Sequence, residues 1–349
     1  MSVRKLEGTV LVTGGSGFIG RRLCGALEAA GSEVVSVRRA GSPTPSWRSV
    51  VADYSDVDQL TSLMAAEKPA YLFHVAGVTK GRTYDDFRDG NVVPTEHLVR
   101  ALERAHPGIE RFVLVSSLTS YGPSRVNHPL HETDPREPIE FYGQSKLEAE
   151  RVVEGSSLPF TIARPAGVYG PGDVDYFNLF QSAMSGINAF FGNRHRLGSM
   201  IYVDDCVRAI VECAAHENTV GKGYFLSTGE PVSWEVLQDA IVSQMDGKTC
   251  TIDLPEQVVH LAAFGGDVVT RIDGKPRLLN RQKAKMGAQD AWTCSADAAR
   301  EDFGFVGETQ LADGVAETHA WYTANGWYRQ SWFSGRSLGR FLRRLGGGD

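Results

Sequence analysis

The first half of the chain alternates short apolar runs with longer amphipathic stretches. The apolar runs are rich in β-branched residues and have no polar face, which is typical of strands buried on both sides of a parallel sheet. These predicted strands cover 9–13, 33–37, 70–75, 111–117 and 160–165. Helices are predicted between them over 18–31, 56–67, 84–106 and 140–154. This order predicts the α/β class, with a doubly wound parallel sheet.

Beyond Pro165 the pattern is less regular. The stretch "GVYGPGD" is a turn-rich loop. Later strands are expected near residues 200 and 224, and we expect both to return to the main sheet. Helical stretches near 233–245, 255–272 and 311–325 predict a smaller C-terminal lobe. The chain therefore divides into 1–165, which carries the sheet, 166–330, and a basic tail over 331–349.

Composition and charge describe an ordinary water-soluble chain. Its 349 residues can bury a sizeable core, and 42% are hydrophobic and 22% charged. A net charge of −6 argues against a nucleic-acid-binding surface over the whole chain. No apolar run has the length of a membrane span, and the first residues lack the pattern of a signal peptide, so we expect a cytoplasmic protein.

The cysteines predict neither disulfides nor a metal site. There are five, an odd number, and they are scattered without a CxxC pair. We therefore expect reduced thiols and no bound metal.

A glycine-rich turn follows the first predicted strand and opens the first predicted helix. In "VTGGSGFIG", Gly14, Gly17 and Gly20 recur every third residue, with Phe18 and Ile19 between the last two. Glycines permit a tight turn and a close backbone approach to a pyrophosphate, whose charge the helix N-terminus attracts. The turn predicts a dinucleotide site.

The second predicted strand ends in Arg38 and Arg39. NAD enzymes usually carry a carboxylate near this position, whereas guanidinium groups suit the 2′-phosphate of NADP. The pair favours NADP(H), with NAD(H) as the other cofactor that the turn admits. The alternative is a pair of solvated loop arginines.

Tyr142 and Lys146 begin the helix predicted over 140–154. Residues four apart lie on one helical face, so a phenol and an ammonium are held side by side. A neighbouring cation lowers the pKa of a phenol and makes it usable for proton transfer near neutrality.

Together these motifs resemble the extended short-chain dehydrogenase/reductase family, including its epimerase/dehydratase and 3-beta-hydroxysteroid dehydrogenase-like branch. The resemblance covers roughly residues 8 to 330. It is carried by "TGGSGFIG", "VADYSD", "HVAGVT", "NVVPTEHLVRA", "VSSLTSYG", "YGQSK", "RPAGVYGPGD" and "YVDD". It implies an enzyme, with 1–165 as an NAD(P)-binding Rossmann domain and 166–330 as the substrate lobe.

The resemblance also assigns further cofactor contacts. Asp53, with Tyr54 beside it, would contact the adenine, and Val75, Ala76 and Gly77 would line the adenosine. Pro165 would complete the set at the end of the last predicted strand, where "RPAGVYGPGD" begins.

For catalysis, the resemblance implies three roles. Ser117 would hydrogen-bond the substrate oxygen, and Tyr142 would pass the proton as hydride moves to or from the nicotinamide. Lys146 would lower the phenol pKa and hold the ribose hydroxyls. Ser116 competes with Ser117 for the first role, and Ser117 could instead cap local backbone.

The substrate class follows from what the family pattern lacks here. Sugar-nucleotide members carry an arginine for the diphosphate just before "IYVDD", where this chain has Gly198, Ser199 and Met200. Arg194 and Arg196 lie upstream, at a different register. Dehydratases add an acidic residue after the catalytic hydroxyl, whereas "LT" follows here.

These differences favour an oxidoreductase that interconverts a ketone and a secondary alcohol on an apolar small molecule, which is steroid-like, flavonoid-like or lipid-derived. A nucleotide-sugar epimerase and a redox-sensing binding module stay open as alternatives. Asp204 and Asp205 are interpreted as the cap of the helix that follows them.

The tail carries an apolar stripe, Leu338, Phe341, Leu342 and Leu345, beside four arginines. Such a segment suits weak contact with an anionic membrane surface. The alternative is packing on its own domain or on the partner of a homodimer.

Overall fold

The structure is a computed structural model that describes residues 3–257 and 281–330. The predicted tail over 331–349 lies outside the described residues, as does most of the helix predicted over 255–272.

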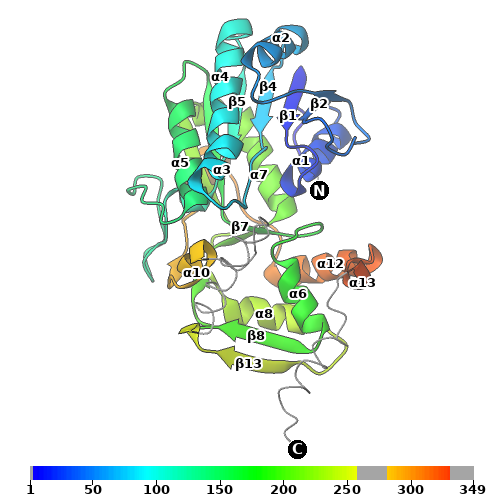
Figure 1. Ribbon diagram of the computed structural model, residues 1–349, viewed down its shortest axis with the longest axis vertical. Helices are drawn as coiled ribbons and strands as arrows, with labels where there is room; N and C mark the ends of the chain where they lie inside the picture. Colours follow the sequence, from blue (N-terminus) through cyan, green and yellow to red (C-terminus); the bar gives the residue numbers. More distant parts are fainter. Residues whose placement is uncertain (1–2, 258–280, 331–349) are drawn as a thin grey trace, which may run out of the picture.

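A seven-stranded parallel sheet forms the upper half of the molecule (Figure 1). Its strand order is β11-β6-β5-β4-β1-β2-β3. The strands are β1 Thr9–Thr13, β2 Glu33–Arg38, β3 Ser49–Val51, β4 Tyr71–His74, β5 Arg111–Val115, β6 Phe160–Pro165 and β11 Lys222–Leu226. The predicted doubly wound sheet is confirmed, and the strand expected near residue 224 lies at its edge. The three-residue β3 was not predicted.

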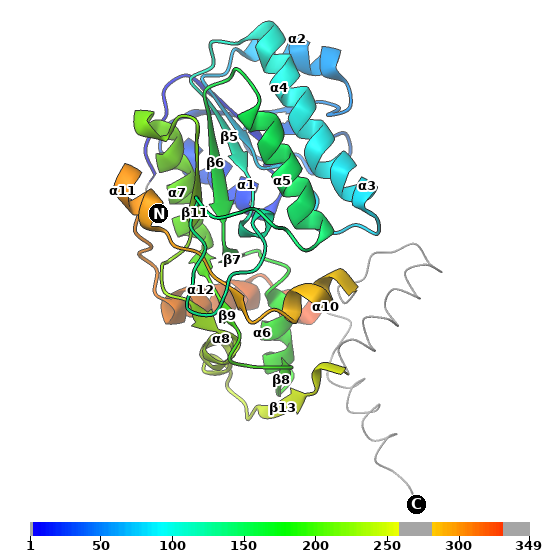
Figure 2. The ribbon, with the colours of Figure 1, turned by 90° about the vertical axis from the view of Figure 1, so that its left-hand side faces the viewer.

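Helices cover both faces of this sheet (Figure 2). One face carries α2 Val57–Glu67, α4 Val93–Ala105 and α5 Phe141–Glu154, and the other carries α1 Phe18–Ala29, α7 Val203–Ala215 and α11 Asp297–Phe303. Successive side chains of β1 point to opposite faces of the sheet. Val10 and Val12 pack with α1 and α7, whereas Leu11 packs with α2 and α4. This double burial explains why the strands are apolar without alternation.

The smaller lobe lies below the sheet in Figures 1 and 2 and is built from short elements. Its helices are α6 Phe177–Met184, α8 Trp234–Val242, α10 Arg281–Gly287, α12 Leu311–Ala324 and α13 Trp327–Gln330. Its strands are β7 Gly167–Tyr169, β8 Ile187–Phe191, β9 Leu197–Gly198, β10 Met200–Tyr202, β12 Val232–Ser233, β13 Cys250–Leu254 and β14 Ala291–Trp292. Helices were predicted near the positions of α8 and α12, and both are present.

The strand near residue 200 corrects one prediction. We expected it in the main sheet, but β10 pairs with β7 in a separate two-stranded sheet. The edge of β6 is already occupied, because Tyr224 and Leu226 of β11 pair with Ala163 and Pro165. The short β10 therefore pairs with the segment that leaves the sheet just after Pro165.

The helix predicted over 84–106 is not continuous. It consists of α3 Tyr84–Phe87, a π-helical turn at Arg88–Val92 and α4, in whose first turn Pro94 lies. Proline has no backbone N–H and its ring collides with the carbonyl four residues earlier, so it suits a helix start rather than a helix interior. The widened turn before it buries Asn91.

The prediction that Asp204 and Asp205 cap a helix was wrong. Both lie in the first turn of α7, which has no side-chain cap. The Asp204 carboxylate instead accepts hydrogen bonds from Arg22 of α1, and the Asp205 carboxylate accepts from Arg208 and from the backbone N–H of Thr309. Arg208 lies one turn along the same helix, but Arg22 and Thr309 are distant in the chain, so local sequence did not reveal the contacts with them.

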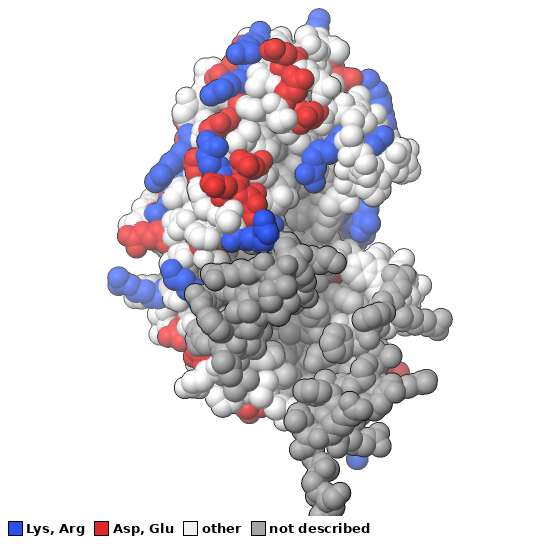
Figure 3. Space-filling model, in the orientation of Figure 1, with Lys and Arg blue, Asp and Glu red and all other residues white. Residues whose placement is uncertain are grey.

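Charges of both signs are intermixed over the upper half of the face in Figure 3, above α3, α4 and α5. Ion pairs between helices contribute to this pattern, including Arg88 with Glu96 and with Glu148. On this part of the surface acidic and basic side chains therefore lie among one another.

The strand order reverses between β1 and β4, which makes this the place where a doubly wound sheet opens a crevice. The turn after β1 and the loop after β4 approach closely here. Gly14 has a φ of +72°, and a Cβ atom on it would lie 2.7 Å from the backbone nitrogen of Ala76.

We therefore expect Gly14→Ala to destabilise the fold. The left-handed conformation alone costs a non-glycine residue about 1–2 kcal/mol, and the collision with Ala76 adds to this. Gly25→Ala is the matched control, because a Cβ at Gly25 in α1 meets nothing within 4 Å. Chemical denaturation should show a lower midpoint for Gly14→Ala and an unchanged or higher one for Gly25→Ala; equal midpoints for Gly14→Ala and the wild type would contradict the argument.

Candidate functional site

A cavity of about 550 Å³ opens at this crevice, a volume that suits a nucleotide cofactor. It extends from the end of β2 to the start of α5. The predicted residues that line it are Gly14, Gly17, Phe18, Ile19, Gly20, Arg38, Arg39, Asp53, Tyr54, Val75, Ala76, Gly77, Tyr142 and Lys146. Two predicted residues, Ser117 and Pro165, are not part of this lining. Their roles stay predictions.

The glycine turn has the shape that a pyrophosphate requires. Gly17 donates its N–H to the Gly14 carbonyl at 2.9 Å, and a Cβ on Gly20 would lie 2.2 Å from the same oxygen. Gly17 is the N-cap of α1, where no side chain caps the helix and no acidic residue occupies the first turn. The N-terminus of a twelve-residue helix therefore borders the cavity, and the cradle fits the phosphates of a dinucleotide.

Arg38 and Arg39 lie at the far end of the cavity. Arg38 is half-buried and donates to the Ser49 hydroxyl at 3.3 Å and to the Ser42 carbonyl at 3.2 Å. Arg39 is exposed. Burial raises the pKa of Tyr54, and the charge of Arg39 partly offsets this rise. Arg38 thus shapes the loop, while Arg39 presents a guanidinium beside the cavity.

Sequence analysis did not single out a buried histidine at the end of β4, next to the loop that lines the cavity. His74 contacts the Thr13 hydroxyl through Nδ1 at 2.8 Å and the Thr95 hydroxyl through Nε2 at 3.0 Å. Burial, helped by the charge of Lys146, lowers the pKa of His74 to about 3, so the ring is neutral. Because Thr13 also accepts the N–H of Ala76 at 3.1 Å, this chain of contacts fixes the loop after β4.

Asn91 connects three segments around the same loop. Its side-chain oxygen accepts the N–H of Val78 at 2.8 Å, and its Nδ2 donates to the Val78 carbonyl at 3.1 Å and to the Ser145 hydroxyl at 2.8 Å. The interrupted helix therefore ties the cavity loop to α5. Pro94 was the local signal that could have indicated this interruption.

Tyr142 and Lys146 lie in the first turns of α5, on one face as predicted. The helix begins here because the Glu140 carboxylate accepts the N–H groups of Tyr142 and Gly143, both at 2.6 Å. The Lys146 ammonium lies 5.9 Å from the centre of the Tyr142 ring and donates to the Val115 carbonyl at 2.9 Å.

The protonation states follow from burial. Burial raises the pKa of the Tyr142 phenol above its usual value, as do Glu140 and Asp175, whereas a hydrogen bond with Ser117 lowers it. Burial lowers the pKa of Lys146 to about 8, against the charge of Glu150, which raises it. Near neutral pH the phenol therefore carries its proton, and the lysine is mainly charged. The lowered phenol pKa that we expected from the neighbouring lysine is not found, because burial raises it.

The two candidate serines have different surroundings. The Ser116 hydroxyl donates to the buried carboxylate of Glu150. The Ser117 hydroxyl faces Tyr142 and also accepts hydrogen bonds from Thr119, from its N–H at 3.2 Å and its hydroxyl at 3.0 Å. Ser117 thus both caps local backbone and contacts the phenol, whereas Ser116 lines the cavity with its hydroxyl bound to Glu150.

Two further segments line the cavity that sequence analysis did not assign to the site. The interrupted helix contributes Asp89, Gly90, Val93 and Pro94, and the segment after β7 contributes Asp173, Val174 and Asp175. Asp175 forms an ion pair with Lys80 at 3.3 Å, which joins the loops after β7 and β4. Within residues 3–257 and 281–330, no group of three or more His, Cys, Asp or Glu side chains could hold a metal ion.

Comparisons with known proteins agree with this geometry. The model of the NAD dependent epimerase/dehydratase family matches residues 10–226. The chain is 29% identical to ceramide reductase of Caulobacter vibrioides, over 92% of this chain and 96% of that protein. It is 30% identical to 3-beta-hydroxysteroid dehydrogenase of Mycolicibacterium neoaurum, over 74% and 76%.

A solved structure has the same fold throughout. MoeE5 in complex with UDP-glucuronic acid and NAD superposes with a TM-score of 0.74 at 25% identity, covering 91% of this chain and all of that one. The glycine cradle, the α5 pair and these matches lead to one assignment. The chain belongs to the NAD dependent epimerase/dehydratase family and is an NAD(P)-dependent enzyme of the extended short-chain dehydrogenase/reductase type.

Proposed function

We propose that this enzyme interconverts a ketone and a secondary alcohol on an apolar, lipid-derived substrate, with NADP(H) as its preferred cofactor. The observation that carries the proposal is the position of Tyr142 and Lys146 at one end of the cavity, with the Ser117 hydroxyl against the Tyr142 phenol. A proton donor, a fixed cation and a hydroxyl lie together where a carbonyl oxygen would be polarised.

When bound, the nicotinamide ring supplies or accepts the hydride. In the direction of reduction, Tyr142 donates its phenolic proton to the carbonyl oxygen, because burial keeps this group protonated. Lys146 then stabilises the phenolate by its charge, and Ser117 donates a hydrogen bond to the substrate oxygen. In the direction of oxidation the proton returns to Tyr142.

Residues of the smaller C-terminal lobe support this substrate class. Gly198, Ser199 and Met200 offer no charge at the position where sugar-nucleotide enzymes of the family bind a diphosphate. Arg194 and Arg196 do not compensate freely, because both already pair with carboxylates. Arg194 pairs with Asp253 and Glu235, and Arg196 pairs with Glu256 at 3.0 Å. The similarity to a ceramide reductase supports a lipid-derived ketone.

A nucleotide-sugar epimerase is the second candidate. It is favoured by the likeness to MoeE5, whose structure holds a UDP sugar and NAD. Calorimetry with UDP-glucose separates the two functions, since an epimerase should bind it and a lipid-ketone reductase should not.

Tyr142→Phe tests the proton donor. The substitution keeps the ring and removes the transferable proton, so turnover of a confirmed ketone should fall about 10²–10⁴-fold. Cofactor affinity, measured by fluorescence, should stay within a small factor of the wild type. Tyr84→Phe is the matched control, because the Tyr84 phenol donates to Glu148 and does not line the cavity. Retention of half the activity in Tyr142→Phe would remove Tyr142 from this role.

Arg39→Ala tests the cofactor preference. A charge-assisted contact with a 2′-phosphate contributes about 1.5–3 kcal/mol, so the wild type should bind NADP at least about tenfold more tightly than NAD. The substitution should remove this preference and leave NAD affinity unchanged. Arg48→Ala is the control, because Arg48 pairs with Glu67. Tighter NAD binding by the wild type in calorimetry would refute the preference.

We also propose that the tail over 331–349 attaches the enzyme weakly to anionic membranes. No helix among the described residues has the length and apolarity to cross a bilayer. The support is therefore the apolar stripe and the arginines of the tail sequence, together with a proposed substrate that partitions into lipid.

Removal of the tail after Arg329 should abolish co-sedimentation with anionic vesicles at low salt. Added salt should have the same effect on the full-length protein, because it screens the arginine charges. Neutral vesicles serve as the control. Equal pelleting of the full-length and truncated proteins would leave the tail as a packing element on its own domain or a dimer partner.

A further inference from the structure

Three side chains of α5, spaced four residues apart, contact three consecutive residues at the end of β5. Tyr142 is hydrogen-bonded with Ser117, Lys146 donates to the Val115 carbonyl, and Glu150 accepts from the Ser116 hydroxyl. Two of the three α5 residues have a role in the proposed function. The third, Glu150, has none so far.

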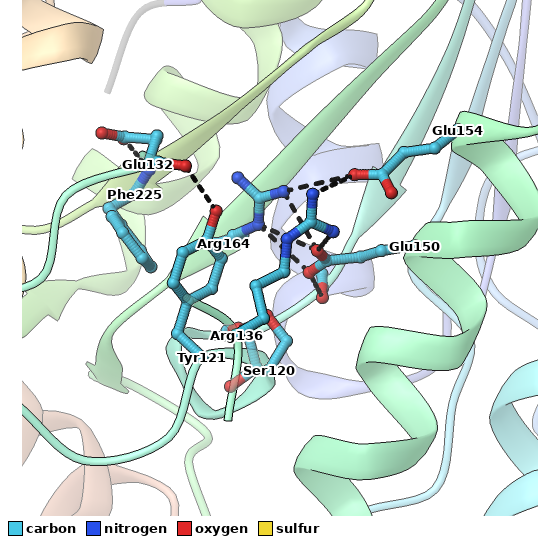
Figure 4. A network of polar contacts seen from close by, with 10 residues as sticks. Ser120, Tyr121, Glu132, Arg136, Glu150, Glu154, Arg164 and Phe225 are labelled. Carbon is cyan, nitrogen blue, oxygen red and sulfur yellow. Dashed lines mark hydrogen bonds and ion pairs between the residues drawn. The ribbon is translucent and has the colours of Figure 1, made fainter. Parts of the chain in front are cut away.

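Glu150 is fully buried and lies at the centre of a network of charges (Figure 4). Its carboxylate accepts from the Arg164 guanidinium, through Nε at 3.1 Å and Nη2 at 3.0 Å, and from Arg136 Nη1 at 3.1 Å. With Ser116, the donors come from β5, β6 and the loop before α5. A carboxylate held from three segments has little freedom to move.

The outer contacts of the network fix the two arginines in turn. Arg136 also pairs with Glu154 at 2.6 Å, and the Arg164 guanidinium lies 5.0 Å from the centre of the Tyr121 ring. The Tyr121 phenol donates to the Glu132 carbonyl at 2.9 Å. Figure 4 shows both guanidinium groups pointing at Glu150 and Glu154, above the Tyr121 ring. The two arginines that bind the Glu150 carboxylate are therefore themselves held in place by further contacts.

We propose that Glu150 is a positioning residue of the catalytic site, which sets a buried carboxylate one helical turn from Lys146 and holds the Ser116–Ser117 corner against α5. The inference rests on the proposed function, in which Lys146 stabilises the phenolate and Ser117 binds the substrate oxygen. Glu150 acts only through these neighbours, because its carboxylate is enclosed by Ser116, Arg136 and Arg164.

The charges around Lys146 give the direction of the effect. On α5 it faces Tyr142, which is protonated, and Glu150; on β4 it faces His74, which is neutral. Asp89, Asp173 and Asp175 line the same cavity from the interrupted helix and the loop after β7. Of these groups, Glu150 is the one that raises the pKa of Lys146 against burial. Without the Glu150 charge, this pKa falls from about 8 toward neutrality, and Lys146 loses its proton at a lower pH.

The test measures Lys146 directly. Competitive acetylation across a pH series, followed by mass spectrometry, reports the pKa of an amine that lines an open cavity. Glu150→Gln should lower the pKa of Lys146 by about one unit or more, since a neighbouring opposite charge typically shifts a pKa by 1–3 units. Glu154→Gln is the matched control, because Glu154 pairs with the same arginines and does not shift Lys146. An unchanged Lys146 pKa in Glu150→Gln overturns the proposal.

A second variant guards against misfolding. Glu150→Gln removes the nearer of the two carboxylates that pair with the buried Arg164, which is destabilising. Replacement of both ions of a buried pair by neutral residues is often tolerated. Glu150→Gln/Arg164→Gln should show the same fall in the Lys146 pKa, and a wild-type pKa in a folded double variant overturns the proposal as well.

Kinetics separate this inference from the proposed function. In Glu150→Gln, kcat should begin to fall about one pH unit lower than in the wild type as the pH is raised. KM should change less than kcat. If Tyr142→Phe stays active, the proposed function fails whatever the acetylation shows. If Tyr142→Phe is inactive and the alkaline limb of Glu150→Gln does not move, the proposed function stands and the role of Glu150 is refuted.

Discussion

The rest of the structure depends on one constraint, which is that a parallel sheet must be covered on both faces. Because strands such as β1 bury side chains on either side, helices have to return the chain to the same edge each time. All strand ends therefore collect at one edge, and the reversal of order between β1 and β4 leaves a gap there. As a result of this topology, three segments meet around the gap: the glycine turn, the loop after β4 and the start of α5.

Local signals were sufficient for the parts of the site that a single segment builds. The glycine turn could be recognised from the spacing of Gly14, Gly17 and Gly20, and the α5 pair from the four-residue spacing of Tyr142 and Lys146. The main strands were found for the same reason, since burial on two faces leaves an unbroken apolar run. Residue types thus gave the fold class, and together with the family resemblance they gave about half of the residues that line the cavity.

What sequence analysis missed depends on contacts between distant segments. The capping role expected for Asp204 was wrong because its partner, Arg22, is 182 residues away. The placement of β10 was wrong because β11, more than twenty residues later, already occupies the edge of β6. Glu150 follows Lys146 by four residues, just as Lys146 follows Tyr142. Its role in the structure depends on Arg136 and Arg164, which no local sequence pattern connects to it.

The late arrival of β11 also sets an order for biosynthesis. This edge strand covers the network from the side, since Phe225 donates its N–H to Glu132 at 2.8 Å and Gly223 lies against the Arg164 guanidinium. Residues 222–226 leave the ribosome only after the whole of α6, β8 and α7 has been made. Until then β6 lacks its edge partner, and the Arg164 end of the network lacks the strand that covers it. Pairing of β11 with β6 joins segments far apart in the sequence, and such contacts form slowly, so we expect the network around Glu150 to be completed late in folding.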